Sequence, residues 1–215
     1  MPKLAGLTFE QAAAVPVAGF TALQALRDRA QVRSGQQVLI NGAAGGVGTF
    51  AVQIAKAFDA EVTAVCSTRN VAMVRSLGAD HVIDYTKEDF TRGGRRFDVM
   101  LDVAANRSVF ACTRVVRSDG TLVIVGAPEG RWLSPVPRMA AALVLSRFVR
   151  PKPGFFLARN NKDDLIVLKE FIEAGKVTPV IDRTYPLSET PAAMRYASGG
   201  HARGKVVITI PGTDR

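Results

Sequence analysis

The chain has 215 residues, 47% of them hydrophobic and 22% charged, and a formal net charge of +9. This length and composition indicate a folded globular protein with one large domain, or with one domain and an appendage. The basic residues are scattered, with short concentrations only at 92–96 and 147–152, and no aromatic residues alternate with them. That distribution argues against a nucleic-acid-binding protein, although an anionic cofactor could use a few of the charges.

The sequence also lacks the marks of secretion, of a membrane span and of a metal site. The two cysteines, Cys66 and Cys112, lie far apart with no CxxC or Cys/His spacing, which predicts neither a disulfide framework nor a zinc site. The first residues show no basic segment followed by a long apolar run. No window approaches the roughly 18 consecutive apolar residues that a membrane helix needs. We therefore expect a cytoplasmic protein that binds neither nucleic acid nor a membrane.

Residues 35–175 alternate short apolar runs with helix-length segments. The order strand, helix, strand, helix, strand is predicted for "QQVLI", "VGTFAVQIAKAF", "EVTAVC", "NVAMVRSLGA" and "HVIDY". A second half follows with the strand "FDVMLDVA", the helix "NRSVFACTRVVRSDG" and the strand "TLVIVGA". Near-continuous apolar strands are typical of a parallel sheet that is covered on both faces. The pattern predicts a doubly wound α/β fold with helices on both faces.

The pattern changes after Gly126. A loop punctuated by prolines precedes the expected helix "MAAALVLSRF", and "RPKPGFFLA" is predicted to contain a sixth strand. A helix from Asp163 to Ala174 should end at Gly175, a typical C-cap residue. The tail then predicts a strand, a helix from about Ser188 with that serine as N-cap, and a final strand. The expected divisions are a connecting helical segment over 1–34, the sheet domain over 35–175 and the tail over 176–215.

The stretch "NGAAGGVG", residues 41–48, lies between the first strand and the first helix of this domain. A glycine-rich turn in that position can present free backbone N–H groups at the positive end of the helix dipole, which favours a bound pyrophosphate. Gly45 would let the phosphates approach the backbone, and Gly48 would let the helix pack closely on the sheet. Ala43 replaces the first glycine of the usual GxGxxG pattern, which is acceptable if its φ stays negative. The alternative is a close-packed helix start without a ligand.

The second strand ends in Cys66, Ser67, Thr68 and Arg69, where NAD-binding proteins of this fold carry an acid for the ribose 2′-hydroxyl. Hydroxyls and a guanidinium suit a 2′-phosphate, because Arg binds phosphate with charge-assisted hydrogen bonds. The residues therefore favour NADPH over NADH. Alternatively, Ser67 and Thr68 only cap the following helix.

Three further residues are candidate acid/base groups by residue type. His81 precedes an apolar strand, and His201 lies in a turn that follows two glycines. We expect neither to be catalytic. Asp102 ends the strand "VMLDV" and could act as a general base or cap the next turn.

Four stretches together resemble the medium-chain dehydrogenase/reductase superfamily, most closely its zinc-free quinone oxidoreductase and enoyl reductase branch. They are "LTFEQAAAVPVAGFTALQAL", "GQQVLINGAAGGVG", "VRSLGADHVIDY" and "HARGKVVITI", and the resemblance runs from about Leu7 to Ile210. It implies a six-stranded Rossmann sheet. Zinc alcohol dehydrogenases of the superfamily have a cysteine ligand where this chain has Val17, so the resemblance implies an enzyme without zinc.

The resemblance also implies roles for individual residues. The pyrophosphate would be contacted by Ala44, Gly45, Gly46, Val47 and Gly48. The adenosine 2′-phosphate would be surrounded by Ser67, Arg69 and Tyr85. The nicotinamide would be approached by Thr21, Ala104, Val125, Gly126, Phe155 and Phe156, and the tail would return to the cofactor at Arg203 and Lys205. The competing interpretations are a strand-end aromatic for Tyr85, core packing for the two phenylalanines and solvation for Arg203 and Lys205.

Members of the superfamily normally carry an N-terminal GroES-like domain that supplies most of the substrate pocket, and the chain is expected to lack it. We expect the cofactor-binding part of an NADPH-dependent enzyme that transfers hydride to a quinone or an enone, with its catalytic residues unassigned. A non-catalytic NADPH-binding or interaction protein is one alternative, and an enoyl reductase domain of a polyketide or fatty-acid synthase is another. The tail strands would expose sheet edges, and a homodimer through the sixth strand, Phe155 to Ala158, is a candidate assembly.

Overall fold

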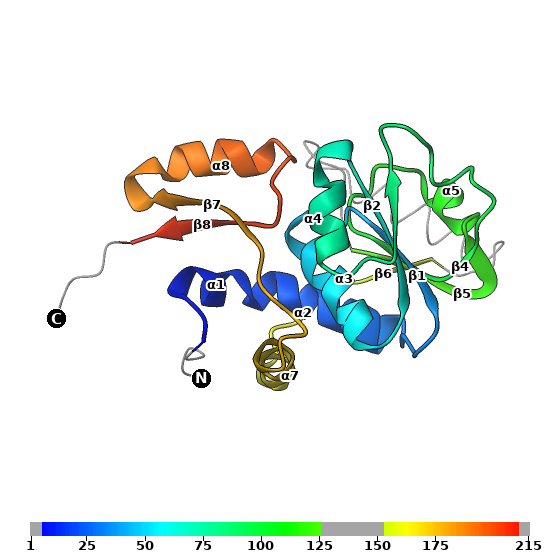
Figure 1. Cartoon of the computed structure of the whole chain (residues 1–215), viewed down its shortest axis with the longest axis horizontal. Coiled ribbons are helices and arrows are strands. Elements are labelled where there is room, and N and C mark those ends of the chain that lie inside the picture. Colours follow the sequence, from blue (N-terminus) through cyan, green and yellow to red (C-terminus); the bar gives the residue numbers. More distant parts are fainter. Residues whose placement is uncertain (1–5, 126–152, 211–215) are drawn as a thin grey trace.

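The computed structural model describes residues 6–125 and 153–210, and these contain a six-stranded parallel sheet in the order β3-β2-β1-β4-β5-β6 (Figure 1). The strands are β1 (Gln37–Asn41), β2 (Glu61–Cys66), β3 (His81–Asp84), β4 (Phe97–Asp102), β5 (Val116–Ile124) and β6 (Pro153–Phe155). This is the strand order of the dinucleotide-binding Rossmann fold. The predicted fold class is confirmed.

The sheet has a hydrophobic core on each face because successive side chains of a strand point to opposite faces. In β1, Val38 and Ile40 belong to one buried cluster and Leu39 to the other. In β4, Leu101 faces the first cluster and Met100 the second. All five side chains are fully buried, which explains why these strands read as continuous apolar runs.

Helices cover both faces of the sheet. The first cluster is closed by α2 (Pro16–Gln24), its continuation η1 (Ala25–Arg29), α3 (Gly46–Ala57), α4 (Val71–Ser76) and α7 (Lys162–Glu173). The second cluster is closed by the short helix α5 (Val109–Thr113). Helix α7 starts at the N-cap Asn161, whose side chain accepts a hydrogen bond from the Asp163 N–H, and it is followed by Gly175 with φ +69°. That positive φ explains why a glycine follows this helix.

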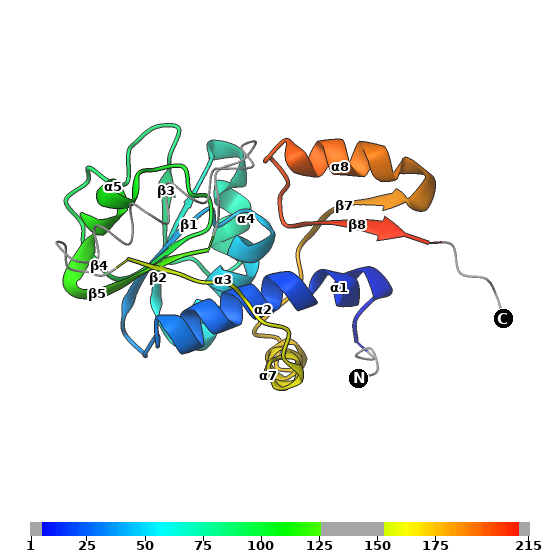
Figure 2. The ribbon, with the colours of Figure 1, turned by 180° about the vertical axis from the view of Figure 1, so that it is seen from behind.

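The tail forms a separate parallel unit of strand, helix and strand. Strand β7 (Ile181–Pro186) pairs with β8 (Lys205–Thr209), and the turn η3 (Leu187–Glu189) and helix α8 (Thr190–Ser198) connect them. Figure 2 shows this unit beside the sheet domain, with helix α1 (Phe9–Ala14) next to its strands. The tail strands therefore pair with each other and, among the described residues, with no other strand.

Two local predictions are wrong. The segment 106–120 is helical only at α5, because β5 begins at Val116 and its first residues pair with β4 across a register shift. Gly120 lies within β5, where an added Cβ would lie 2.5 Å from the Asp98 carbonyl oxygen, so the pairing with β4 requires glycine at this position. Ser188 is not the N-cap of α8, which begins at Thr190 after Glu189. The predicted helix "MAAALVLSRF" lies outside the described residues.

Candidate nucleotide-binding site

A cleft of about 450 Å³ opens at the carboxyl ends of the strands, where the chain order reverses between β1 and β4. Ligands of doubly wound sheets bind at this switch point. Six residues predicted to bind the cofactor line the cleft: Ala44, Gly45, Ser67, Arg69, Tyr85 and Ala104. Eleven others that were not predicted also line it: Asn41, Gly42, Val65, Cys66, Asn70, Val103, Ala105, Asn106, Gly200, His201 and Ala202.

The glycine-rich loop has the geometry that a phosphate-binding turn requires. The left-handed backbone conformation falls on Gly42 (φ +89°) and not on Ala43, which explains why an alanine is accepted there. A Cβ on Gly48 would lie 2.1 Å from the Gly42 carbonyl oxygen, so only glycine allows the helix to approach the loop this closely. The first intrahelical hydrogen bond of α3 is donated by Thr49 to the Gly45 carbonyl.

The start of α3 therefore offers unpaired donors. Its N-cap is Gly45, which has no side chain to accept from the first turn. The N–H groups of Gly46, Val47 and Gly48 precede the first intrahelical bond and have no intrahelical acceptor. Together with the helix dipole, these donors fit a pyrophosphate.

The tail returns to this loop. The Gly204 N–H donates to the Ala44 carbonyl oxygen at 2.9 Å. A Cβ added to Gly46 would lie 2.9 Å from Lys205 Cδ and 3.7 Å from Lys205 Nζ. The Lys205 side chain thus lies over the start of α3, where its ammonium group adds positive charge next to the unpaired donors.

A second basic group lies at the end of β2, in the turn η2 (Thr68–Asn70). Arg69 donates from Nη2 to the His201 carbonyl oxygen at 2.6 Å, and Arg203 donates from Nη2 to the Arg69 carbonyl oxygen at 2.7 Å. Arg203 Nε also donates to Asn70 Oδ1 at 2.8 Å. Because a guanidinium has five N–H donors, both arginines keep donors for a ligand. The tail and the turn after β2 thus hold two guanidinium groups beside the cleft.

The two hydroxyls of this turn differ in their surroundings. Ser67 lines the cleft, where its Oγ accepts from Asn70 Nδ2 at 3.2 Å, and it makes no side-chain cap to the following turn. Thr68 does not line the cleft, because its hydroxyl donates to Asp84 Oδ2 at 2.5 Å. This hydrogen bond is the main reason why the pKa of Asp84 is lowered. Sequence reasoning did not foresee that Thr68 would bind the end of β3.

Cys66 is the last residue of β2 and lines the cleft as a buried thiol. Burial, together with the negative charge of Asp84, raises its pKa to about 11. The thiol is therefore neutral at physiological pH. Tyr85 lies beside it and is 39% exposed, with its ring on the rim of the cleft.

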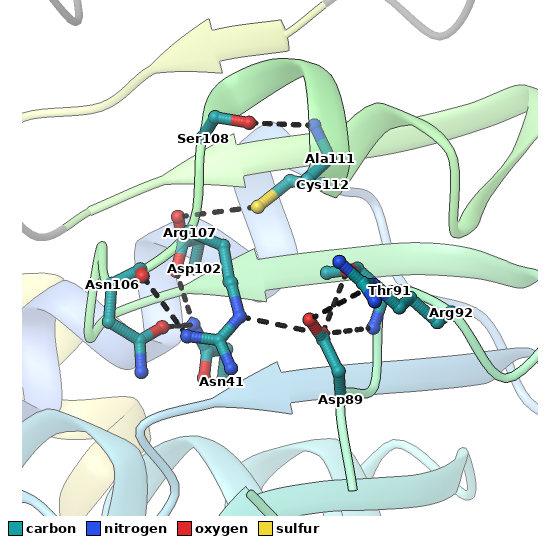
Figure 3. A network of polar contacts seen from close by, with 10 residues as sticks. All are labelled: Asn41, Asp89, Thr91, Arg92, Asp102, Asn106, Arg107, Ser108, Ala111 and Cys112. Carbon is teal, nitrogen blue, oxygen red and sulfur yellow. Dashed lines mark hydrogen bonds and ion pairs between the residues drawn. The ribbon is translucent and has the colours of Figure 1, made fainter.

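A buried amide network joins β1 to β4 at the floor of the cleft (Figure 3). Asn41 Nδ2 donates to Asp102 Oδ1 at 2.8 Å and to Asn106 Oδ1 at 2.9 Å. Asp102 Oδ1 also accepts from the Ala105 N–H at 3.1 Å, which confirms the capping role foreseen for this aspartate. Asn41 is 1% exposed, and within the described residues its Oδ1 has no hydrogen-bond partner. A donor of a ligand or a water in the cleft would satisfy this oxygen.

Four residues predicted to approach the nicotinamide do not line this cleft. The Thr21 hydroxyl donates to the Val17 carbonyl oxygen at 2.7 Å within α2. Phe155 packs against one hydrophobic cluster, and Phe156 and Val125 pack against the other. Ala104 alone of this group lines the cleft, and Gly126 lies outside the described residues.

The two histidines lie apart. His81 Nε2 is 3.1 Å from Glu61 Oε1 at the N-terminal ends of β3 and β2, away from the cleft, whereas His201 lines the cleft. Over residues 6–125 and 153–210, no three His, Cys, Asp or Glu side chains are arranged to hold a metal ion. Over the same residues, no helix combines the length and apolar character that a membrane span requires.

Comparison with known proteins points to one group of enzymes. Residues 77–208 match the family described as zinc-binding dehydrogenase. The chain is 38% identical over 229 residues to the mouse (Mus musculus) "NAD(P)H oxidoreductase RTN4IP1, mitochondrial", covering 97% of this chain and 57% of the relative. It is 35% identical over 211 residues to the "NADPH-dependent alkenal/one oxidoreductase, chloroplastic" of Arabidopsis thaliana, covering 96% and 48%.

A solved structure agrees with this. The quinone oxidoreductase from Coxiella burnetii superposes with a TM-score of 0.84 at 32% identity, over 97% of this chain and 63% of that protein. The chain therefore spans less than two thirds of the length of these relatives and corresponds to their cofactor-binding portion.

Proposed function

Because the chain belongs to the medium-chain dehydrogenase/reductase superfamily, we propose that it is the cofactor-binding part of a zinc-independent, NADPH-dependent oxidoreductase. The proposed reaction is hydride transfer to a quinone or to an α,β-unsaturated carbonyl compound. The observation that carries the proposal is the pair of guanidinium groups, Arg69 and Arg203, at a β2 end that has no acid. Arg69 lines the same cleft as the phosphate-binding loop, and Arg203 directly follows Ala202, which also lines it.

The preference for NADPH follows from the charge at that end of the cleft. Arg69 and Arg203 are both positive. Two acids lie nearby: Asp84 accepts a hydrogen bond from Thr68 and lies 3.7 Å from Lys87 Nζ, and Asp182 accepts from the Arg203 N–H at 3.0 Å and interacts electrostatically with Arg183. Lys87 and Arg183 offset the charges of these two acids, so the two guanidinium groups leave a net positive field. A 2′-phosphate would gain charge-assisted hydrogen bonds there, whereas the 2′-hydroxyl of NADH would leave the guanidinium groups without an anionic partner.

The residues of this chain would bind and orient the cofactor. The N–H groups of Gly46, Val47 and Gly48, with Lys205 over them, are the proposed pyrophosphate ligands. Ser67, Arg69 and Tyr85 are the proposed contacts of the adenosine 2′-phosphate. When bound, the reduced nicotinamide supplies the hydride. Thr21, Val125, Phe155 and Phe156 stay candidates for its surroundings.

The substrate class and the absence of zinc rest on two further arguments. Relatives are named for quinones and for alkenals and alkenones, which are all electrophilic acceptors of hydride. By resemblance, Val17 stands where zinc alcohol dehydrogenases have a cysteine ligand, and valine has no atom that binds zinc. Without zinc, hydrogen-bond donors would have to stabilise the developing oxyanion.

Two features of the assembly are also proposals. Within residues 6–125 and 153–210, strand β6 is an edge strand of the sheet, and Leu157, two residues after its end, is 90% exposed. An open edge next to an exposed apolar side chain supports a homodimer through residues 155–158. A cytoplasmic location stays an expectation of the sequence.

The proposed function is tested by titrating the protein with NADPH and with NADH while following nicotinamide fluorescence. We expect saturable binding of NADPH that is about tenfold or more tighter than that of NADH, because at least one charged hydrogen bond is involved. No binding of NADPH at millimolar concentration, or tighter binding of NADH, would contradict the proposal. Oxidation of NADPH on addition of a quinone or an enone would then separate an enzyme from a non-catalytic binding protein.

A further inference from the structure

A small cavity at the end of the sheet opposite the cofactor cleft is surrounded by arginines. It has a volume of about 160 Å³ and lies at the N-terminal ends of β4 and β5. Its lining residues include Arg92, Arg95, Arg96 and Arg114, and no acidic residue. The cofactor cleft opens at the carboxyl ends of the strands, so the two sites are separated by the length of the sheet.

The loop that carries three of these arginines is fixed at both ends. Phe90 and Phe97 are 4% and 3% exposed and belong to the same hydrophobic cluster. Asp89 Oδ1 accepts from the Thr91 N–H at 3.0 Å and from the Thr91 hydroxyl at 2.8 Å (Figure 3). Gly94, with φ +72°, turns the chain between these anchors. The exposed residues 92–96 are therefore held on a short loop whose ends are fixed, which lowers the entropic cost of binding a ligand.

The positive charge of this cavity is largely uncompensated. Within the described part of the chain, the side chains of Arg95, Arg96 and Arg114 make no hydrogen bond or ion pair, and all three residues are exposed. Of the four arginines, only Arg92 forms an ion pair with an acid of the described residues, at 3.8 Å from Asp89 Oδ2. That carboxylate is already shared with Arg107. Guanidinium groups gathered without counter-charges repel one another, and an anion between them would relieve this repulsion.

We propose that this cavity binds a phosphate group, the terminal phosphate of a small polar phosphomonoester. Guanidinium groups bind phosphate oxygens in a bidentate manner, and the volume suits one phosphate group and excludes a whole dinucleotide. A neighbouring cleft of about 210 Å³ shares Arg95 and Arg96 and adds Glu61, His81 and Thr63. These polar groups can hydrogen-bond the hydroxyls of the organic part, so a phosphorylated polyol is the chemistry that fits both cavities.

The test is calorimetric titration of the full chain with inorganic phosphate and with glycerol 3-phosphate at constant low ionic strength, because salt screens exposed charges. We expect the double variant Arg95→Gln/Arg96→Gln to bind both about tenfold or more weakly, since charged hydrogen bonds to the anion are lost. Arg33→Gln is the matched control. Arg33 is exposed on the loop before β1, at the same end of the sheet as the cavity, and it lines neither cavity. Unchanged thermal unfolding of each variant checks that the fold is intact.

A further variant distinguishes this cavity from the cofactor cleft. Arg69→Gln should leave the affinity for glycerol 3-phosphate unchanged. If Arg69→Gln abolished phosphate binding and Arg95→Gln/Arg96→Gln did not, the phosphate would occupy the cofactor cleft and the proposal would be wrong. Equal phosphate affinity of the wild type, the double variant and the Arg33 control would also overturn it.

The source of the phosphomonoester is tested with vesicles. Phosphatidic acid carries the same terminal phosphate as glycerol 3-phosphate. Binding of glycerol 3-phosphate supports a soluble ligand. Binding to vesicles that contain phosphatidic acid, lost in Arg95→Gln/Arg96→Gln, supports a lipid headgroup in the same cavity. Absence of binding to all of these probes would refute the site.

Discussion

Replacing Gly48 by alanine tests whether the phosphate-binding loop depends on close packing. The added Cβ would lie 2.1 Å from the Gly42 carbonyl oxygen and 2.7 Å from Ala43 Cα. Ordinary contacts begin at 3.4 Å, so the start of α3 and the loop would have to separate by about 1.3 Å. Both contacts are with backbone atoms, which cannot rotate away as a side chain can.

The expected loss of stability is that of an overpacked core site, about 1–3 kcal/mol. For a chain of this size that lowers the melting temperature by roughly 2–12 °C. The separation would also turn the N–H groups of the first turn away from a pyrophosphate, and we expect NADPH to bind at least about tenfold more weakly. Differential scanning calorimetry and nicotinamide fluorescence measure the two effects.

Gly93→Ala is the matched control, because a Cβ there meets no atom within 4 Å and its φ is not positive. This variant should keep the melting temperature and the NADPH affinity of the wild type. If Gly48→Ala behaved like Gly93→Ala in both assays, the close approach of helix and loop would not matter, and the reasoning on this loop would be refuted.

Three further changes probe the surroundings of the cleft. Arg203→Gln loses the hydrogen bonds to Asn70 Oδ1 and to the Arg69 carbonyl oxygen, so it should lower both the melting temperature and the NADPH affinity. The exposed control Arg195→Gln should change neither quantity. Equal effects of the two variants would contradict the role of Arg203. Because the Cys66 pKa is about 11, its alkylation by iodoacetamide should be slow at pH 8, rise steeply towards pH 11 and be slowed by NADPH; fast alkylation at pH 8 would be inconsistent with a neutral buried thiol. The Thr91 N–H and hydroxyl lower the pKa of Asp89, so its charge stabilises the fold above the unfolded pKa of about 3.9, and this contribution is lost as the pH falls through the native pKa. Asp89→Asn should therefore lower the melting temperature more at pH 7 than at pH 3; an equal decrease at both values would argue against this linkage.

The sequence was sufficient to predict the sheet and the loop, because both depend on local patterns. Strands buried on both faces appear as continuous apolar runs, and β1, β2, β4 and the second half of β5 lie where these runs are. The glycine spacing of residues 42–48 places the phosphate-binding turn between strand and helix. Ser67 and Arg69 also lie beside the cleft as predicted, because they directly follow β2.

Other parts of the site could not be read from local patterns. The hydrogen bond from Thr68 to Asp84 and that from Arg203 to Asn70 join residues 16 and 133 positions apart, and no periodicity records such contacts. Asn41 is the last residue of β1, and a polar side chain at the end of an otherwise apolar strand was the available signal for it. The helix predicted up to Gly120 failed because the pairing of β5 with β4 overrides the helical propensity of the isolated segment.

The claim that the cleft recognises the 2′-phosphate of NADPH is tested most directly by the ratio of the dissociation constants of NADH and NADPH, measured for the wild type and for Arg69→Gln. The guanidinium would contact the 2′-phosphate and no part of NADH. The account therefore predicts that Arg69→Gln weakens NADPH about tenfold or more and leaves NADH unchanged, so that the ratio falls towards one. An equal loss of affinity for both cofactors, or an unchanged ratio, would contradict it.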